Sequence, residues 1–519
     1  MIESITLKNY KAFEDVTIPI KPLTILLGAN SVGKSSIIQM LMLLHQTAEE
    51  RQGMYSSAMK IYGNYVNVGA FDNLFKDKDT SKSLQIRIQF SDEYTSDLIK
   101  HSNENFIDKF RNAVSFLPIP ENEVGDYENL SVRNSFLQYV SNLKKQIDVI
   151  YKKESNLYTF IRKRLELPFD HDDANNIDNI LRCYDLTKKV SNCGSSNYWI
   201  TYNFSIDNAK LKIKRFSVEL GNNLPLLEIE NKTESNVKIN SFFPLIKKDA
   251  DYILSKIHFD KTIFDIISEI EESDEPTPVA EYLVRLVYDF VTEIQGSLYE
   301  NRLNYVSPLR AHPKRYYMLD KAKMTISLDT LDGDAIAEVL KENNSVKKNV
   351  NEWFNKFGFK IDVKPFKEII HHMYVTQNGL PLDITDVGFG ISQVLPIIIQ
   401  GFLAQPGSIT IVEQPEIHLH PKMQADLGDL LIDIVKTDNK KLIVETHSEY
   451  ILRRIRRRIS EGKLKKDDVA ICLFHPKTNE GPAWVEKLDI NEKGAFKWPE
   501  EYYDGELTLD VTEFLKNQN

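Results

Sequence analysis

The sequence has few cysteines, and their spacing excludes two common roles. Cys183, Cys193 and Cys472 are the three cysteines in 519 residues, and no two of them have a C-x-x-C spacing. Such a set predicts neither a zinc site nor a disulfide framework. Free thiols are usual in a reducing compartment, so the cysteine content favours a cytoplasmic protein.

Long apolar segments are also missing. No run of about 18 apolar residues occurs, which is the length that a helix needs to cross a bilayer. The first residues, MIESITLKNYKAFEDV, alternate apolar and polar side chains and lack the basic and apolar segments of a signal peptide. With 42% hydrophobic and 27% charged residues, the composition is that of an ordinary globular chain. We therefore expect a cytoplasmic location and no membrane partner.

An excess of positive charge is the third feature that the chain lacks. Its formal net charge is −10, which argues against a surface that is basic all over and binds nucleic acid everywhere. A local basic patch could still bind phosphates in an acidic chain. DNA therefore stays a candidate partner on charge alone.

One complete motif, G-x-x-x-x-G-K-[ST], runs from residue 28 to residue 35, between an apolar strand and a predicted helix. A chance glycine turn would lack this strand and helix context. The motif turns backbone N–H groups toward phosphate, and the N-terminus of the following helix adds positive potential. Its lysine reaches the β- and γ-phosphates and its serine binds Mg²⁺, so ATP and Mg²⁺ are the expected cofactors. The predicted nucleotide-binding residues are Gly28, Asn30, Gly33, Lys34, Ser35 and Ser36.

A second apolar strand, at 408–413, ends in acidic residues and has the form of a Walker B strand. We predict that Glu413 holds Mg²⁺ together with Ser35. The next position usually carries the carboxylate that activates water, but here it is Gln414, whose amide can align water and cannot take its proton. Hydrolysis of ATP should therefore be slow. Glu416 is close enough to be a substitute base, and the sequence leaves open which residue acts.

A third motif, VGFGISQ at 387–393, precedes a long predicted helix. Two glycines, a hydroxyl and a helix N-terminus make a second anion-binding nest. One chain cannot easily wrap both nests round one triphosphate. We therefore expect the second nest of one chain to cap ATP bound by another chain, which predicts a homo-oligomer, dimeric or larger. The residues assigned to this nest are Gly388, Gly390, Ser392 and Gln393.

His447, in the sequence ETHS at the end of another apolar strand, is a candidate sensor of the γ-phosphate. A lone histidine is more often structural, and the order of the motifs is what favours the functional interpretation. His418 and His420 could be mistaken for metal ligands. The following Pro421 instead favours a loop at the seam between two chains.

Strands and helices alternate in the first and last parts of the chain, which predicts a mainly parallel sheet with helices on both faces. We expect an α/β fold, a P-loop ABC-type ATPase head split by an insertion. The lobe at 1–90 carries the P-loop, and the lobe at 301–519 carries the other motifs. The insertion at 91–300 should be mainly helical with a few strands. One amphipathic helix of this insertion is indicated by Phe136, Val140, Leu143, Ile147 and Ile150.

These blocks, in this order, resemble the ABC-type ATPase heads of the RecF, SMC and OLD (overcoming lysogenization defect) group. GANSVGKSS is similar to the Walker A motif of that group, VGFGISQ to its signature, VEQPEIHLHP to its Walker B and D-loop, and ETHS to its His switch. The resemblance covers about 1–90 and 300–519. Three stretches are similar to those of a bacterial subgroup of OLD-like ATPases found in antiphage systems such as PARIS, Septu and retron operons: EQPEIHLHP, SPLRAHP at 307–313 and WPEEYYDGEL.

The resemblance implies an ATP-gated scaffold or sensor in an antiphage complex. OLD nucleases carry a Toprim domain after the His switch, whereas no D-x-D motif follows His447 here. The resemblance therefore implies a separate effector, such as a nuclease or toxin. The alternative is a RecF-like DNA-binding ATPase in DNA repair. Its candidate contacts are the five arginines at 453–458, although arginines all round one helix also suit a solvated or salt-bridged surface. Arg310 could contact phosphate or an interface, with a structural role favoured.

Overall fold

The computed structural model divides, by its internal contacts, into two compact units. The first unit comprises Met1–Leu7 and Gln46–Gly296, and the second comprises Lys8–His45 and Ser297–Asn519. The structure describes residues 2–50, 57–90, 92–116, 130, 132–153, 176–193, 198–221, 223–233, 236–271, 275–310, 312–318, 333–367, 369–387, 389–478 and 481–496.

The first unit is built on an antiparallel sheet. The strand order is β2-β1-β4-β5-β6-β7-β8, and β4 to β8, which lie wholly in the first unit, pair antiparallel. By its contacts, β2 belongs to the second unit. Alternate side chains of β4 are buried, as expected for strands that bury one face. The strands are β1 (Ile2–Tyr10), β2 (Phe13–Pro19), β4 (Leu84–Phe90), β5 (Tyr198–Asp207), β6 (Lys210–Leu220), β7 (Leu224–Thr233) and β8 (Asn236–Asn240).

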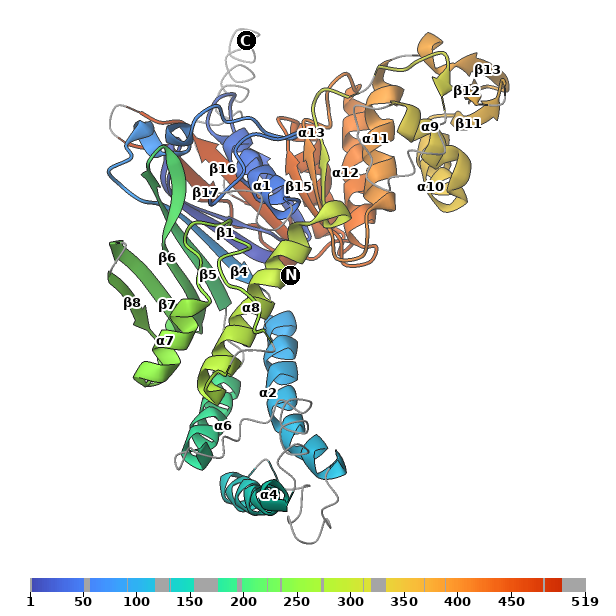
Figure 1. Ribbon diagram of the computed structural model, residues 1–519. Helices are drawn as coiled ribbons and strands as arrows, with labels where there is room; N and C mark the ends of the chain where they lie inside the picture. The colour runs from blue at the N-terminus through green and yellow to red at the C-terminus, as the bar shows by residue number, and fades with distance from the viewer. Residues whose placement is uncertain are drawn as a thin grey trace. The chain divides into compact units, whose positions relative to one another are not determined.

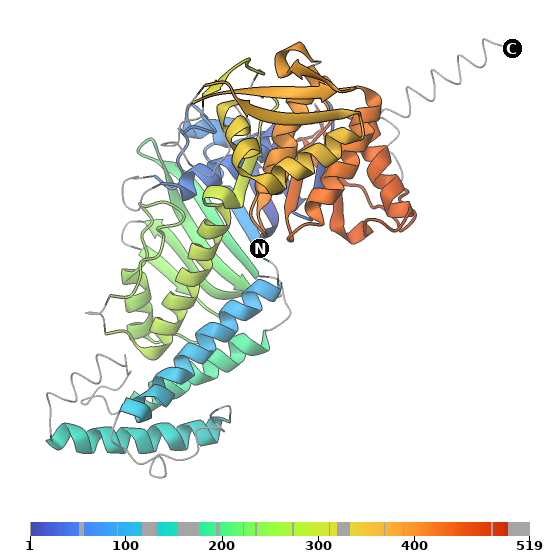
Figure 2. The same cartoon turned by 90° about the vertical axis from the view of Figure 1, so that its right-hand side faces the viewer.

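The first unit also contains α-helices, and α6 lies beside α2 (Figure 2). Phe136, Val140, Leu143 and Ile147 are all buried on α4, so the predicted amphipathic helix is present. The ring of Phe136 stacks on that of Tyr184, with centroids 4.5 Å apart, and so joins α4 to α6. The helices are α2 (Asp92–Phe116), α4 (Arg133–Lys153), α6 (Asn176–Asn192), α7 (Lys247–Ser255) and α8 (Pro278–Leu298).

A six-stranded sheet with the order β17-β16-β3-β15-β14-β9 forms the core of the second unit. All its pairs are parallel except β16–β17. Every residue of β3, β14 and β15 is buried, as is usual for parallel strands covered on both faces. The predicted α/β P-loop ATPase fold is confirmed. The strands are β3 (Leu23–Leu27), β9 (Leu303–Val306), β14 (Ile409–Glu413), β15 (Lys441–Glu445), β16 (Val469–His475) and β17 (Trp484–Lys487).

Of the helices in this part of the chain, α11 and α12 contact the strands and lie side by side (Figure 1), and α13 packs on α12. Two of the helices have a side-chain N-cap. The His420 side chain accepts a hydrogen bond from the backbone N–H of Lys422 at the start of α12. The Ser448 side chain accepts one from the backbone N–H of Ile451 at the start of α13. The four helices are α1 (Lys34–Ala48), α11 (Phe389–Leu403), α12 (Pro421–Val435) and α13 (Glu449–Ser460).

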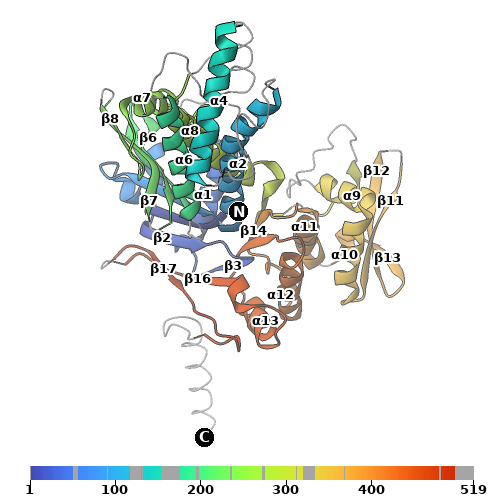
Figure 3. The same ribbon diagram turned by 90° about the horizontal axis from the view of Figure 1, so that it is seen from below.

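A smaller antiparallel sheet in the second unit has the order β10-β12-β11, with β13 also paired to β12. Helices α9 and α10 cover one face of this sheet (Figure 3). Across the described residues of both units, no helix combines the length and the apolar character that a membrane span requires. The elements are β10 (Tyr317–Met318), β11 (Phe359–Pro365), β12 (Ile370–Gln377), β13 (Leu380–Asp383), α9 (Gly333–Glu342) and α10 (Asn344–Asn355).

Candidate functional site

The loop between β3 and α1 has a shape that only glycine allows at its two ends. Gly28 has φ 144° and Gly33 has φ 105°, values that residues with a side chain rarely adopt. A Cβ on Gly28 would lie 2.8 Å from the carbonyl oxygen of Phe474, and one on Gly33 would lie 2.5 Å from the ring of Phe13. The loop is thus pressed against these residues while 29–31 stay exposed. This cradle of backbone suits a polyphosphate.

Lys34 holds its charge inside this loop. Its Nζ donates to the carbonyl oxygens of Gly28 at 2.9 Å and Ala29 at 2.7 Å, and it lies 3.7 Å from Glu445. Burial lowers the pKa of Lys34, while the negative charge of Glu445 opposes that shift. The ammonium group therefore lies at the N-terminus of α1, where a phosphate would be attracted by both charge and helix dipole.

The remaining residues predicted for the loop differ in exposure. Asn30 is exposed, whereas Ser36 is partly buried at the first turn of α1. The backbone N–H of Ser36 donates to the carbonyl oxygen of Gly33, and the phenol of Tyr10 donates to the carbonyl oxygen of Ser36 at 2.9 Å. Ser36 thus anchors the first turn of the helix.

Two carboxylates meet at the ends of neighbouring strands. Glu413 ends β14 and Glu445 ends β15, directly opposite each other in the parallel register. Tyr305 donates to Oε1 of Glu413 at 2.7 Å, and the Ser35 hydroxyl donates to Oε2 of Glu445 at 3.2 Å. The structure therefore does not join Ser35 directly to Glu413, its predicted partner at the metal. Burial raises the pKa of both carboxyls, and a bound cation would stabilise their charged forms.

Sequence reasoning missed Glu445 as a site residue. Its signal was nevertheless present, because KLIVE ends in an acid after an apolar run just as ITIVE does. Among the described residues, no group of three or more His, Cys, Asp or Glu could hold a metal ion by itself. Mg²⁺ in phosphate sites takes one or two carboxylates and completes its shell with phosphate and water. Ser35, Glu413 and Glu445 fit that kind of site.

Glu416 bridges the turn after β14 to the turn after β15. Its Oε2 accepts the Thr446 hydroxyl at 2.8 Å, and its Oε1 accepts the backbone N–H of His447 at 2.6 Å. Burial raises the pKa of this carboxyl. Both of its oxygens are thus engaged in holding the segment that carries His447.

His447 has a free ring nitrogen. Its Nε2 is shielded from solvent and has no hydrogen-bond partner among the described residues. Burial lowers the pKa of this histidine, and the positive charge of Lys34 lowers it further. Both effects favour the neutral form of the imidazole.

The second predicted nest lies at the start of α11, which begins at Phe389. Gly388 lies outside the described residues. Ser392 and Gln393 are buried, and Gly390 is partly exposed. A Cβ on Gly390 would lie 3.2 Å from the carbonyl oxygen of His418, so this helix start packs against the loop at 416–420.

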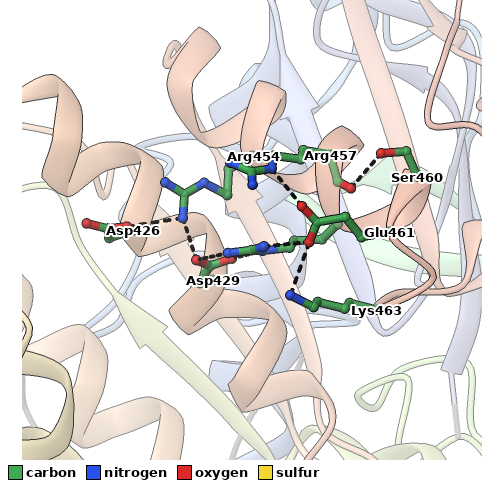
Figure 4. A network of polar contacts seen from close by, with 8 residues as sticks. Asp426, Asp429, Arg454, Arg457, Ser460, Glu461 and Lys463 are labelled. Atoms are coloured by element: carbon green, nitrogen blue, oxygen red, sulfur yellow. Dashed lines mark hydrogen bonds and ion pairs between the residues drawn. The ribbon is translucent and has the colours of Figure 1, made fainter.

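The five arginines of α13 have partners within the chain. Figure 4 shows the contacts of two of them, Arg454 and Arg457. Arg454 pairs with Asp426 and Asp429 of α12, and Arg458 pairs with Asp429 and Glu461. On the same helix, Arg456 donates to the carbonyl oxygen of Gly494, while Arg453 and Arg457 pair with Glu449 and Glu461. These contacts favour the salt-bridged surface over a nucleic-acid patch.

Comparison with known proteins gives one family and two curated relatives. The family model of the AAA ATPase domain (AAA_15) matches residues 1–452. Protein ea59 of Escherichia phage lambda is 21% identical over 301 residues, 55% of this chain and 53% of ea59. The OLD nuclease of Thermus scotoductus is 30% identical over 95 residues, 18% of each chain. This chain thus spans about half the length of the first relative and less than a fifth of the second.

Solved structures of SMC heads are similar only at a low level. The SMC head bound to the C-winged helix domain of ScpA aligns with a TM-score of 0.39 and 13% identity, covering 95% of this chain and 98% of that chain. The SMC head domain from Thermotoga maritima aligns with a TM-score of 0.34 and 8% identity, covering 94% and 99%. TM-scores this low support no inference about the partners or the activity of this chain.

Lys34→Ala should weaken Mg-ATP binding by about 10- to 100-fold, because the charge-assisted hydrogen bonds from its ammonium to phosphate are lost. Calorimetric titration with Mg-ATP measures the effect. Lys8→Ala is the matched control, since Lys8 is exposed and pairs with Asp15. Equal affinity of Lys34→Ala and Lys8→Ala would refute the assignment of the loop.

Proposed function

The chain belongs to the AAA ATPase domain family, and on this premise we propose that it is an ATP-gated scaffold or sensor subunit of an antiphage defence complex. ATP binding would close head-to-tail pairs of the chain, and the closed assembly would control a separate effector such as a nuclease or toxin. The ATPase head would be formed by 1–90 and 301–519, with 91–300 as the insertion that holds the partner. The observation that carries the ATP-binding part of the proposal is the charged cradle formed by Lys34 and the loop at 28–33.

Nucleotide binding by this chain would rest on charge and on the backbone N–H groups of the loop and of the first turn of α1. The loop at 28–33, Lys34 and the N-terminus of α1 would hold the phosphates. Ser35 and Glu413, with Glu445 beside them, would hold Mg²⁺, which supplies charge neutralisation to the phosphates when it is bound. His447, with its free Nε2, would hydrogen-bond the γ-phosphate.

Hydrolysis by this site would be slow. Gln414 lies at the end of β14, where a carboxylate would activate the attacking water, and an amide is not basic enough to do so near pH 7. Glu416, the other candidate base, has both carboxylate oxygens bonded to the segment at 446–447. We therefore propose that Gln414 aligns the attacking water. Glu416 would hold the segment at 446–447, which carries His447.

Gln414→Glu should raise the single-turnover rate of ATP hydrolysis by about 10²-fold, because it restores a general base. Gln414→Asn is the matched control, since it keeps an amide and tolerates the left-handed backbone at this position. Rapid quench of pre-bound ATP gives the rates. A rate that Gln414→Glu leaves unchanged, together with hydrolysis abolished by Glu416→Gln, would make Glu416 the base.

The seam between two chains would be formed by the start of α11 and the loop at 416–420. These two segments pack together at Gly390 and His418, and His418 and His420 are both exposed. Because Glu416 ties the same loop to the segment that carries His447, the state of the nucleotide could be transmitted to the seam. This arrangement supports the proposed head-to-tail closure.

His418→Asp should abolish ATP-dependent association while ATP binding is kept, because it places a negative charge at the seam near phosphate. His418 has φ 62°, which Asp and Asn tolerate, so His418→Asn is a neutral control that should still associate. Light scattering with and without Mg-ATP reports the mass of the assembly. Association of His418→Asp at the same ATP and protein concentrations would argue against this seam.

The defence role is supported by resemblance. One curated relative is an OLD nuclease. In the described part of this chain, the residues after the switch complete the ATPase sheet through β16, which pairs with β3. In this proposal, a separate effector supplies the chemistry that acts on phage. The internal pairing of the α13 arginines gives a RecF-like role in DNA repair less support.

Cells that carry this gene with its neighbouring genes should form fewer phage plaques than cells with an empty vector. Lys34→Ala in the same plasmid should restore plaque formation, because the assembly could no longer be gated by ATP. Immunoblotting controls for equal amounts of the two chains. Equal protection by the wild-type chain and Lys34→Ala, or no protection against a broad phage panel, would count against the defence proposal.

A further inference from the structure

Arg310 is a buried arginine that reaches the turn after β14. It follows β9 in the sequence and is 5% exposed. Its Nη2 donates to the carbonyl oxygen of Glu413 at 2.7 Å and lies 3.4 Å from that of Gln414. The guanidinium therefore binds the backbone at the last residue of β14 and at the first residue of the turn that follows it.

The other donors of Arg310 are unused. Nε and Nη1 are shielded from solvent and have no hydrogen-bond partner among the described residues. Burial lowers the pKa of Arg310 to about 10, against the attraction of Glu416 and Glu413, so the group remains charged at neutral pH. A buried charge with free donors is unfavourable for folding. Among the described residues, Arg310 thus donates its hydrogen bonds only to the backbone of the turn after β14.

The backbone of Gln414 is held from two directions. Its N–H donates to the carbonyl oxygen of Glu445 at 2.7 Å, and its carbonyl faces Arg310. Gln414 has φ 44°, in the left-handed region that residues other than glycine seldom adopt. Surrounding contacts must impose such a conformation. They also set the direction in which the Gln414 side chain leaves the backbone.

We infer that Arg310 is a positioning residue for ATP hydrolysis, which acts by fixing the backbone at Gln414 so that the amide side chain aligns the attacking water. The inference rests on the proposed ATPase function and adds a residue to it. Arg310 does not touch the nucleotide in this account. It should therefore affect the rate of hydrolysis and leave ATP binding alone.

The test uses the full-length chain and a double-mutant cycle. Arg310→Met should lower the single-turnover rate by roughly 10- to 100-fold, since small misplacements of an aligning group have effects of that size. The dissociation constant for Mg-ATP should change by less than about threefold, because no phosphate contact is lost. Arg310→Lys keeps the charge and one donor and should recover part of the rate. Arg315→Met is the matched control, an exposed arginine of the same segment paired with Asp386.

The cycle with Gln414→Ala separates positioning from general structural damage. If Arg310 acts through Gln414, Arg310→Met should lower the rate in the wild-type background and change it by less than about threefold in Gln414→Ala. Equal losses in both backgrounds, or an Arg310→Met rate equal to that of the wild type, would overturn the inference alone. A wild-type chain that neither binds nor hydrolyses Mg-ATP would overturn the proposed function as well. If Arg310→Met does not fold, the Arg310→Lys rate in the two backgrounds decides in the same way.

Discussion

The parallel pairing of β3, β15 and β14 is the constraint on which the whole site depends. Their carboxyl ends share one edge of the sheet, so the loop at 28–33 and the carboxylates of Glu413 and Glu445 are brought together. A slip of one residue in either pairing would turn a carboxylate to the other face of the sheet. The fully buried apolar runs of these strands fix the register and thereby the chemistry at their ends.

Contacts beyond the strand ends form a continuous path from the nucleotide loop to the proposed seam. Lys34 lies 3.7 Å from Glu445, two residues before His447; the His447 backbone N–H donates to Glu416, and the loop after Glu416 packs on Gly390. Each link is an ion pair, a hydrogen bond, a packing contact or the chain itself. Such contacts have few alternative arrangements, so a change at the phosphate could move the seam as a unit.

Local motifs made part of this site predictable from the sequence. The loop at 28–35 is a complete motif between an apolar strand and a predicted helix, and Glu413 ends another apolar strand, so both could be predicted from neighbouring residues. The α/β fold could be predicted from the alternation of strands and helices. The contacts of Glu445 and Tyr305 depend on strand register over separations of 410 and 108 residues, which a single sequence does not reveal. Nor does a motif show that Ser392 is buried.

The central claim is that each ATP site is shared between two chains, and mixing two defective chains tests it most directly. Lys34→Ala removes the phosphate site of its own chain, whereas His418→Asp removes the seam that its chain offers to a partner. In a mixed pair, one complete site is left, so the mixture should hydrolyse ATP although neither variant does so alone. The control is each variant mixed with the wild-type chain, which should be active. If the mixture of the two variants stays inactive while these controls are active, the shared site is contradicted. Hydrolysis by His418→Asp alone at the wild-type rate would contradict it as well.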